Sequence, residues 1–311
     1  MRNRFHSLMI NGPAVLVGSL ALLFVMAQAN AADTDAKAIK AAVPWVPHKL
    51  ADGQPDVQGF WGAEIQGTFS LVNPRNGGGS APTRWDVAKH EGKTGPIRPS
   101  RIVDPQDGLV PYQPWARAKQ QDIEANIERP TKQEYIDPQA RCFPDGVPRN
   151  AFWTGFRIQQ HPGYVVITYD QNHTYRVIPL DGRPHIPENI KLWMSDSRGH
   201  WEGNTLVVDV TNSNAGHRLS NEGDFSSDAV HITERFSFVD ANNFNYEARL
   251  TDPTVYTKPW TIASKFKRTN KDEPDYEQWE QSCHEGERSA ETSFLGEKNE
   301  SEKTEQGNRK L

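Results

Sequence analysis

Cysteine is scarce in this chain of 311 residues, which contains only Cys142 and Cys283. No Cys-x-x-Cys motif is present, which argues against a paired-cysteine metal site. In an oxidising compartment, two lone cysteines most simply form a disulfide, which here would close a loop of about 140 residues. A catalytic cysteine is the alternative, but Cys283 and His284 are adjacent and would point apart on a strand. We predict the disulfide Cys142–Cys283.

Long hydrophobic runs are also missing after the first 31 residues. The N-terminus combines Arg2 and Arg4 with an apolar stretch at 14–27 and a small-x-small triplet that ends at Ala31. This pattern is typical of a secretory signal peptide. Asn-Gly-Pro at 11–13 interrupts the stretch and leaves it short of the roughly 20 apolar residues of a membrane span. We predict cleavage after Ala31 and a periplasmic or secreted mature protein without membrane contact; an N-terminal anchor is the alternative.

Positive charge is not in excess. The formal net charge is −5, and there is no arginine-rich arm, which argues against nucleic acid as a partner. Residues 286–311 are charged and poor in aromatics, which is typical of a disordered tail. The remaining length suits one large β domain or two small ones, and we predict a single β-rich domain over 32–285.

Several catalytic motifs are absent as well. The chain has no His-Glu-x-x-His, no Gly-x-Ser-x-Gly and no dinucleotide-binding glycine fingerprint. These absences argue against a helical zinc site, a serine nucleophile of the hydrolase type and a nucleotide cofactor. We predict no cofactor and no metal. A metal site formed by histidines that only the fold brings together, such as His185, His200 and His231, is the alternative.

Short runs of β-branched and aromatic residues recur with turns between them, mostly after Phe152. Their spacing predicts an all-β fold, an antiparallel lipocalin-like barrel or sandwich with one or two short peripheral helices. Residues 84–107 show no period and are expected to be a surface excursion. The expected strands are 57–62, 156–160, 164–170, 174–180, 205–211, 229–239, 244–251 and 260–268, with an edge strand at 276–283.

One segment has helical periodicity, from Tyr112 to Ile127. Pro114 suits the first turn of a helix, where its missing N–H costs nothing. A buried stripe is expected along one face of this helix. Its members are Trp115, Ala118, Ile123 and Ile127.

Polar residues crowd into the segment from Asp181 to Asp209. We expect a loop followed by the strand from Thr205, with residues 199–203 as a tight turn. General acid/base chemistry is what these residue types allow, because histidine titrates near neutrality and a carboxylate can orient it. The catalytic candidates are His185 and His231 as proton carriers, with Glu234 and Asp181 as their partners.

Candidate binding residues lie near these groups in the sequence. Arg183 and Arg235 are expected to hold an anionic group, since a guanidinium presents paired donors to a carboxylate. Aromatic side chains supply flat walls for an apolar or aromatic ligand. The candidates for this role are Trp193, Trp201 and Tyr256.

Alternation along the strands leaves two interpretations open. Glu234 shares a face with Val230, Ile232 and Phe236, whereas His231 and Arg235 lie on the other face. If the apolar face is the barrel interior, Glu234 is buried and must be paired, for example with an arginine, or functional. If the polar face lines a cavity, His231 and Arg235 belong to the site. In 174–180, Tyr175 and Val177 oppose Thr174, Arg176 and Ile178.

Six motifs occur in order along the chain. They are PDxxGxW at 55–61, CxPxGxPR at 142–149, DGRPH at 181–185, GxWEGxTLVVD at 199–209, ERF at 234–236 and DPxxYxxPWT at 252–261. The set resembles a large family of secreted bacterial proteins of mostly unassigned function, and it implies no particular activity or cofactor. This chain has His200 where the family usually has arginine and Asn204 where the family usually has aspartate.

Two functions are consistent with these observations. The first is a cofactor-independent lyase, isomerase or hydrolase that acts on a small apolar or aromatic substrate by general acid/base catalysis. The second is a carrier or sensor that binds an apolar small molecule without chemistry. An enzyme of the first kind requires that His185, His231, Glu234 and Arg183 converge. A carrier requires an apolar cavity with scattered polar groups.

Overall fold

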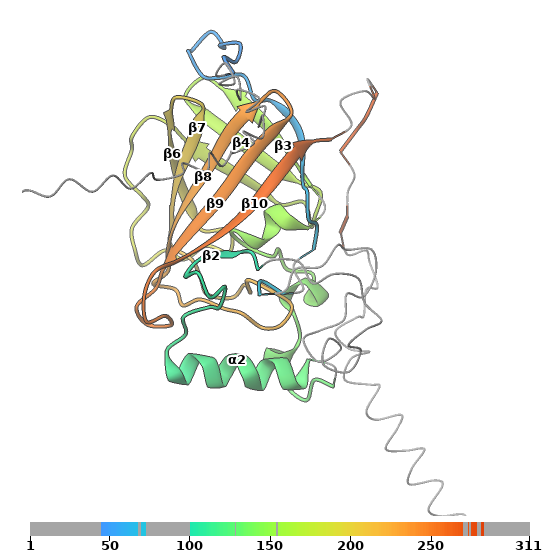
Figure 1. Cartoon of the computed structure of the whole chain (residues 1–311), viewed down its shortest axis with the longest axis vertical. Coiled ribbons are helices and arrows are strands. Elements are labelled where there is room, and N and C mark those ends of the chain that lie inside the picture. The colour runs from blue at the N-terminus through green and yellow to red at the C-terminus, as the bar shows by residue number, and fades with distance from the viewer. Residues whose placement is uncertain are drawn as a thin grey trace, which may run out of the picture. The chain divides into compact units, whose positions relative to one another are not determined.

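The computed structural model describes only part of the chain (Figure 1). Outside it lie the predicted signal peptide, the predicted tail and Cys283, so these assignments and the disulfide stay predictions. None of the cysteines in the described part is a free thiol. No helix found there is both long enough and apolar enough to cross a membrane. The described residues are 45–67, 70–72, 100–127, 129–153, 155–269, 273, 275–278 and 281–282.

Ten antiparallel strands form one sheet that curves into a nearly closed barrel (Figure 1). An all-β barrel is therefore confirmed, with a short helix beside it. The strand order is β5-β4-β3-β1-β10-β9-β8-β7-β6, and β2 pairs with β10 off this path. The bounds are β1 Gly59–Ala63, β2 Ile102–Asp104, β3 Phe156–His161, β4 Tyr164–Tyr169, β5 Tyr175–Pro179, β6 Asp196–Glu202, β7 Thr205–Thr211, β8 His231–Asp240, β9 Asn243–Thr251 and β10 Trp260–Arg268.

The two terminal strands of this order, β5 and β6, meet at a seam that side chains join. Arg176 of β5 donates from Nη2 to Ser197 Oγ of β6 at 2.9 Å. Gly199 of β6 lies so close to β5 that a Cβ there would fall 2.7 Å from Ile178 Cγ2. The absence of a side chain at Gly199 therefore allows the barrel to come close to closure.

The interior of the barrel is filled by aromatic side chains from its strands. Phe244 stacks on Phe266 with ring centroids 4.8 Å apart, and Trp61 meets Phe244 edge-on at 5.0 Å. Phe236 and Tyr246 add a further edge contact at 5.0 Å. All five side chains are almost fully buried. Alternation in β8 and β9 places these rings inside, as the sequence pattern predicted.

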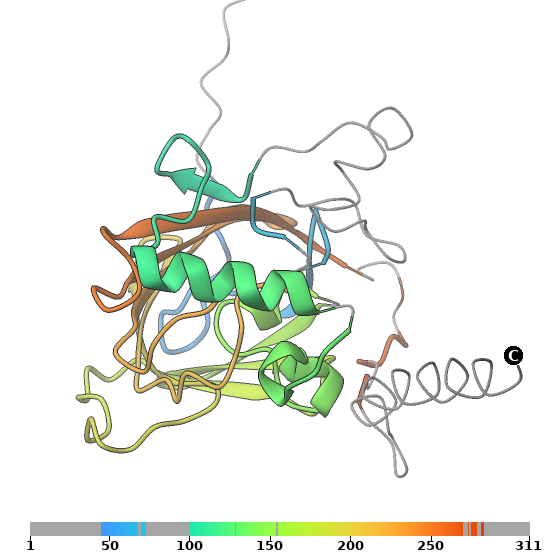
Figure 2. The ribbon, with the colours of Figure 1, turned by 90° about the horizontal axis from the view of Figure 1, so that it is seen from below.

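The helix α2, Pro114–Asn126, crosses one end of the barrel (Figure 2). Gln120 of α2 donates from Nε2 to the Glu222 carbonyl at 2.8 Å, which ties the helix to the loop at 212–228. The helix was predicted, but its buried stripe was largely wrong. Trp115 is half exposed, and the buried residues are Ala116, Gln120, Ile123 and Glu124. Three 3₁₀ turns follow, η1 Gln133–Tyr135, η2 Pro138–Arg141 and η3 Arg149–Phe152.

Two sequence expectations differ from the fold. Residues 199–203 belong to the β6–β7 hairpin, and most of them lie in β6 rather than in a turn alone. The expected surface excursion at 84–107 contributes β2 to the sheet. In β5 the two faces separate as alternation predicted: Tyr175 is 64 % exposed, whereas Arg176 is buried and pairs with Glu234 inside the barrel. At the expected edge strand, the described residues show one isolated bridge, Gln171 with Gln281.

Candidate functional site

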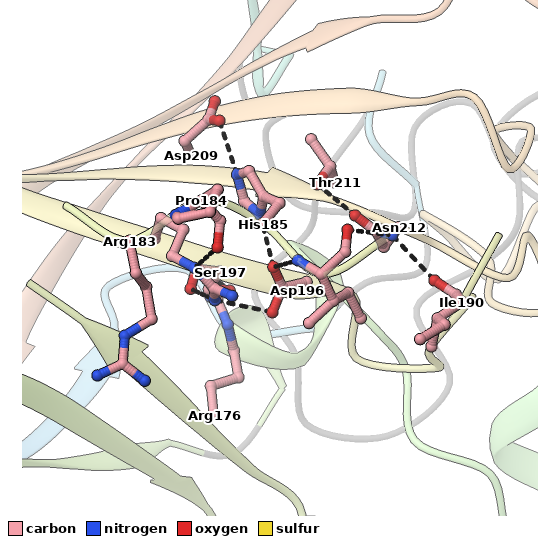
Figure 3. A network of polar contacts seen from close by, with 12 residues as sticks. Arg176, Arg183, Pro184, His185, Ile190, Asp196, Ser197, Asp209, Thr211 and Asn212 are labelled. Atoms are coloured by element: carbon pink, nitrogen blue, oxygen red, sulfur yellow. Dashed lines mark hydrogen bonds and ion pairs between the residues drawn. The ribbon is translucent and has the colours of Figure 1, made fainter. Parts of the chain in front are cut away.

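His185 lies between two carboxylates on the outer side of the barrel (Figure 3). Its Nδ1 is 2.6 Å from Asp196 Oδ2, and its Nε2 is 2.9 Å from Asp209 Oδ2. Each ring nitrogen of His185 therefore has a carboxylate partner, and the two contacts fix the orientation of the imidazole.

Strand register brings the two acids together. Asp209 of β7 is opposite Arg198 of β6, and Asp196 is two residues before Arg198 on the same face. The loop that follows β5 carries His185 across this face. Asp196 is held from both sides, since Arg198 Nη1 donates to its Oδ1 at 2.8 Å and the Ile186 amide donates to its Oδ2 at 3.3 Å.

Asp209 also accepts a hydrogen bond from His231, the first residue of β8. Asp209 pairs with Thr233 in the sheet, and His231 is two residues from Thr233 on the same face. One carboxylate therefore bridges His185 and His231. Burial acts to raise the pKa of Asp209, but the hydrogen bonds from His231 and His185 lower that pKa more, and the net pKa is below the usual range. Asp209 is thus kept as a carboxylate beside the two imidazoles.

A pocket of about 410 Å³ lies at the seam of β5 and β6. Asp196 and Ser197 line it from β6, and Arg176 and Val177 line it from β5. The guanidinium of Arg176 is turned toward Glu234 and Ser197 and also hydrogen-bonds Tyr169, so Arg176 forms part of the wall with its donors engaged inside the barrel.

The pocket and the histidines form a continuous polar chain. It runs from Asp196 in the pocket wall to His185, then to Asp209, and ends at His231. The side chain of His231 is 47 % exposed, so this end meets solvent. A chain of alternating carboxylate and imidazole groups can move a proton between the pocket and water.

Glu234 does not belong to this chain, contrary to the catalytic set expected from the sequence. It is buried inside the barrel, where Arg176 donates to both of its oxygens at 3.1 and 2.5 Å and the Tyr246 hydroxyl donates at 2.7 Å. Strand alternation explains this placement, because Glu234 and His231 are an odd number of residues apart in β8. Of the two interpretations, pairing with an arginine is the one that the structure supports. Burial raises the pKa of Tyr246 well above its usual value, and the neighbouring Glu234 raises it further.

Asp181 and Arg183 pair with each other at the surface, with Arg183 Nε 2.8 Å from Asp181 Oδ2. Hydrogen bonds from the Arg183 side chain and then its amide lower the pKa of Asp181 to about 2. Arg183 points away from His185 (Figure 3). The four residues that an enzyme was expected to bring together therefore do not converge. His185 and His231 meet through Asp209, whereas Glu234 and Arg183 lie elsewhere.

Of the predicted binding residues, only Trp193 lies beside the seam pocket. It stacks on Phe143 with centroids 4.4 Å apart and donates to the carbonyl of Pro144, which lines the pocket. Besides Arg183, which pairs with Asp181, three more predicted binding residues have different partners. Arg235 pairs with Glu202 at 2.7 Å, Trp201 donates to Gln54 at 3.2 Å, and buried Tyr256 donates to the Phe225 carbonyl at 2.7 Å.

Asp196 and Asp209 were not predicted as site residues. A signal for Asp209 is present, because it is the acid on the outward face of a strand that is otherwise apolar, TLVVDVT. Asp196 could have been found only if β6 had been recognised.

His200 lies farther along the same hairpin, 3.2 Å from Glu202. Within the described ranges no group of three or more His, Cys, Asp or Glu is arranged to hold a metal.

Comparison with protein-family models, with curated proteins and with solved structures finds no match for this chain. The resemblance drawn from the six motifs therefore stays a prediction.

Proposed function

We propose that this protein is an exported, cofactor-independent enzyme that performs general acid/base chemistry on a small molecule bound at the β5–β6 seam. A lyase, an isomerase or a hydrolase would use such a site. One observation carries the proposal: Asp196 both lines the pocket and contacts His185, the next member of a polar chain that ends at exposed His231.

The proposed proton path follows from this geometry. In the tautomer that carries its proton on Nδ1, His185 passes that proton to Asp196, from which the substrate takes it. At the same time Nε2 takes a proton from Asp209, which is resupplied from water through His231. Proton abstraction from a substrate uses the same path in reverse. A positioned acid or base of this kind contributes rate factors on the order of 10²–10⁴.

The walls of the pocket support a substrate with an apolar body and an oxygen acceptor. Val177, Leu192 and Met194 supply apolar surface. Ser195 is another lining residue, and its buried Oγ has no hydrogen-bond partner in the part of the chain that is described. A carbonyl or carboxylate oxygen would satisfy this donor, because burying a donor unpaired costs free energy.

The carrier alternative has less support. A barrel that carries an apolar ligand holds it in its interior, whereas aromatic rings and the Arg176–Glu234 pair occupy the interior here. The polar groups on the outer side of the barrel, from Asp196 to His231, are also joined by hydrogen bonds rather than scattered.

Ligand capture followed by a conversion assay tests the proposal. The mature protein is incubated with periplasmic extract, bound compounds are identified by native mass spectrometry, and each is tested for conversion. We expect Asp196→Asn and His185→Gln to bind the compound and to lose conversion. Glu202→Gln is the matched control, since Glu202 contacts a histidine and an arginine on the same sheet but lies outside the chain. Conversion at the wild-type rate by Asp196→Asn would contradict the proposal, and capture without conversion by the wild type would favour a carrier.

A further inference from the structure

A second pocket, of about 370 Å³, lies at the end of the barrel that α2 crosses. Its walls come from α2, from the 3₁₀ turn η2 and from the loop at 215–228, with Val255 behind them. It shares no lining residue with the seam pocket. Any ligand here is therefore separate from the substrate of the proposed reaction.

Four buried polar atoms in the walls of this end pocket have no hydrogen-bond partner among the described residues. They are Arg141 Nε, His217 Nε2, Arg218 Nη1 and Ser226 Oγ. The two guanidinium atoms can only donate, and the serine hydroxyl can donate as well. Leaving a charged donor buried without an acceptor costs more than leaving a neutral one. The set is therefore short of acceptors, which an anionic oxygen would supply.

Arg218 is the most deeply placed cation of the pocket. Its Nη2 donates to the Glu134 carbonyl, so the guanidinium is held in place while Nη1 is left over. Burial lowers the pKa of Arg218, but an arginine stays protonated at neutral pH. The adjacent His217 is neutral there, because burial and then the charge of Arg149 lower its pKa to about 4. Of these two adjacent residues, only Arg218 is therefore positively charged at neutral pH.

The acidic residues of the walls are turned toward other partners. Glu134 is 3.4 Å from Lys132, and Asp228 is 4.0 Å from Lys191. Lys119, by contrast, adds a further cation to the pocket, with its Nζ 4.6 Å from the centre of the Phe225 ring. The electrostatic balance inside the pocket therefore favours an anion.

Aromatic side chains form one wall. Trp115 and Phe225 lie with ring centroids 6.0 Å apart, tilted by 55°. Trp115 is 50 % exposed although its Nε1 donates to the Thr254 carbonyl at 3.2 Å, so its indole is fixed with much of its surface uncovered. An exposed, anchored indole next to unpaired donors is suited to a flat ring that carries a negative group.

We infer that the end pocket binds a small aromatic carboxylate. The carboxylate accepts from Arg218 Nη1 and Ser226 Oγ, and the ring lies against Trp115 and Phe225. This inference does not rest on the proposed reaction, because the two pockets have no residue in common.

Isothermal titration calorimetry on the mature chain tests it, with benzoate and inorganic phosphate as separate probes. We expect benzoate to bind at least tenfold more tightly than phosphate, since phosphate gains nothing from the aromatic wall. Arg218→Met should weaken the binding of benzoate about tenfold or more, in line with the loss of a charge-assisted hydrogen bond. Arg249→Met is the matched control, because Arg249 is an exposed arginine paired with Asp104 at 3.4 Å and lies outside the pocket.

Buried Arg218 also supports the fold, so Trp115→Ala and Ser226→Ala provide the same test with smaller changes. We expect each of them to weaken the binding of benzoate. Asp196→Asn, in the seam pocket, should leave the affinity for benzoate unchanged. Three results would overturn the inference: no heat of benzoate binding at millimolar concentration, equal affinity for phosphate, or loss of benzoate binding in Asp196→Asn.

Discussion

Asp209 and His231, which are 22 residues apart in the sequence, are joined by a side-chain hydrogen bond across neighbouring strands. The same carboxylate contacts His185 through its other oxygen. Sequence reasoning chose the two histidines, and the structure adds the acid that links them. The chain from Asp196 to His231 depends on this bridge.

Removing His231 should raise the pKa of Asp209. Its hydrogen bonds to His231 and His185 hold that pKa down against burial, so His231→Ala removes the largest of the lowering contributions. Carbon-detected NMR titration of the Asp209 carboxyl measures the change. His200→Ala is the control, because His200 contacts Glu202 and not Asp209. An unchanged Asp209 titration in His231→Ala would mean that the bridge does not form in solution.

Breaking the buried pair inside the barrel should destabilise the fold. Glu234→Gln leaves the guanidinium of Arg176 buried without its counter-charge, and we expect a loss of about 3–5 kcal/mol in unfolding free energy. The double variant Arg176→Met, Glu234→Leu should recover most of that loss, since it buries no charge. Urea unfolding of the single and double variants measures both values. A Glu234→Gln variant as stable as the wild type would contradict the pairing.

Closure at the seam should be sensitive to one added methyl group. Gly199→Ala places a Cβ against Ile178 Cγ2, and we expect a loss of about 1–3 kcal/mol from overpacking. Ile178→Ala removes that Cγ2, so the two substitutions should cost less together than the sum of their separate effects. Thermal or urea unfolding of the wild type, the two single variants and the double variant gives the coupling free energy between the two sites. Simple additivity would show that β5 and β6 do not approach each other at this point.

Two buried groups, Asp145 and His217, should give opposing pH dependences of stability. Burial raises the pKa of Asp145 to about 6, so the folded state holds its proton between about pH 4 and 6 while the unfolded state does not. This contribution to stability therefore falls as pH rises through that window. His217 has a lowered pKa of about 4, so its contribution rises with pH between about 4 and 6.5.

The two contributions largely cancel in the wild type, and single variants should separate them. We expect the stability of Asp145→Asn to rise with pH over this window and that of His217→Gln to fall, each by up to about 3 kcal/mol. Denaturant unfolding at several pH values measures the slopes. Parallel pH profiles for the wild type and both variants would contradict this account.

Strand alternation predicted most of the barrel from the sequence. The strands at 205–211 and 260–268 have the expected bounds, and the aromatic face of 229–239 does point inward. The strand β6 was missed because DSRGHWE is largely polar and contains a glycine, both unusual in a strand. Its pairing with β7 and the close approach of Ile178 to Gly199 are tertiary effects that local pattern does not reveal.

The candidate site was predicted only in part, for the same reason. His185 and His231 were chosen by residue type, and they do share a carboxylate. Their linking acid, Asp209, was not predicted as a site residue, because it lies within the expected strand at 205–211. Glu234 was chosen as a partner although alternation places it on the opposite face from His231, and the fold follows alternation.

The central claim is that the chain from Asp196 to His231 carries protons for a reaction in the seam pocket. Turnover of the captured compound by His231→Ala, with and without imidazole in the buffer, tests this most directly. We expect kcat to fall by at least about tenfold, KM to stay near the wild-type value and added imidazole to restore much of kcat, because a small base can replace the missing one at the solvent end. Wild-type kcat in His231→Ala, or a loss that imidazole does not relieve, would contradict the claim.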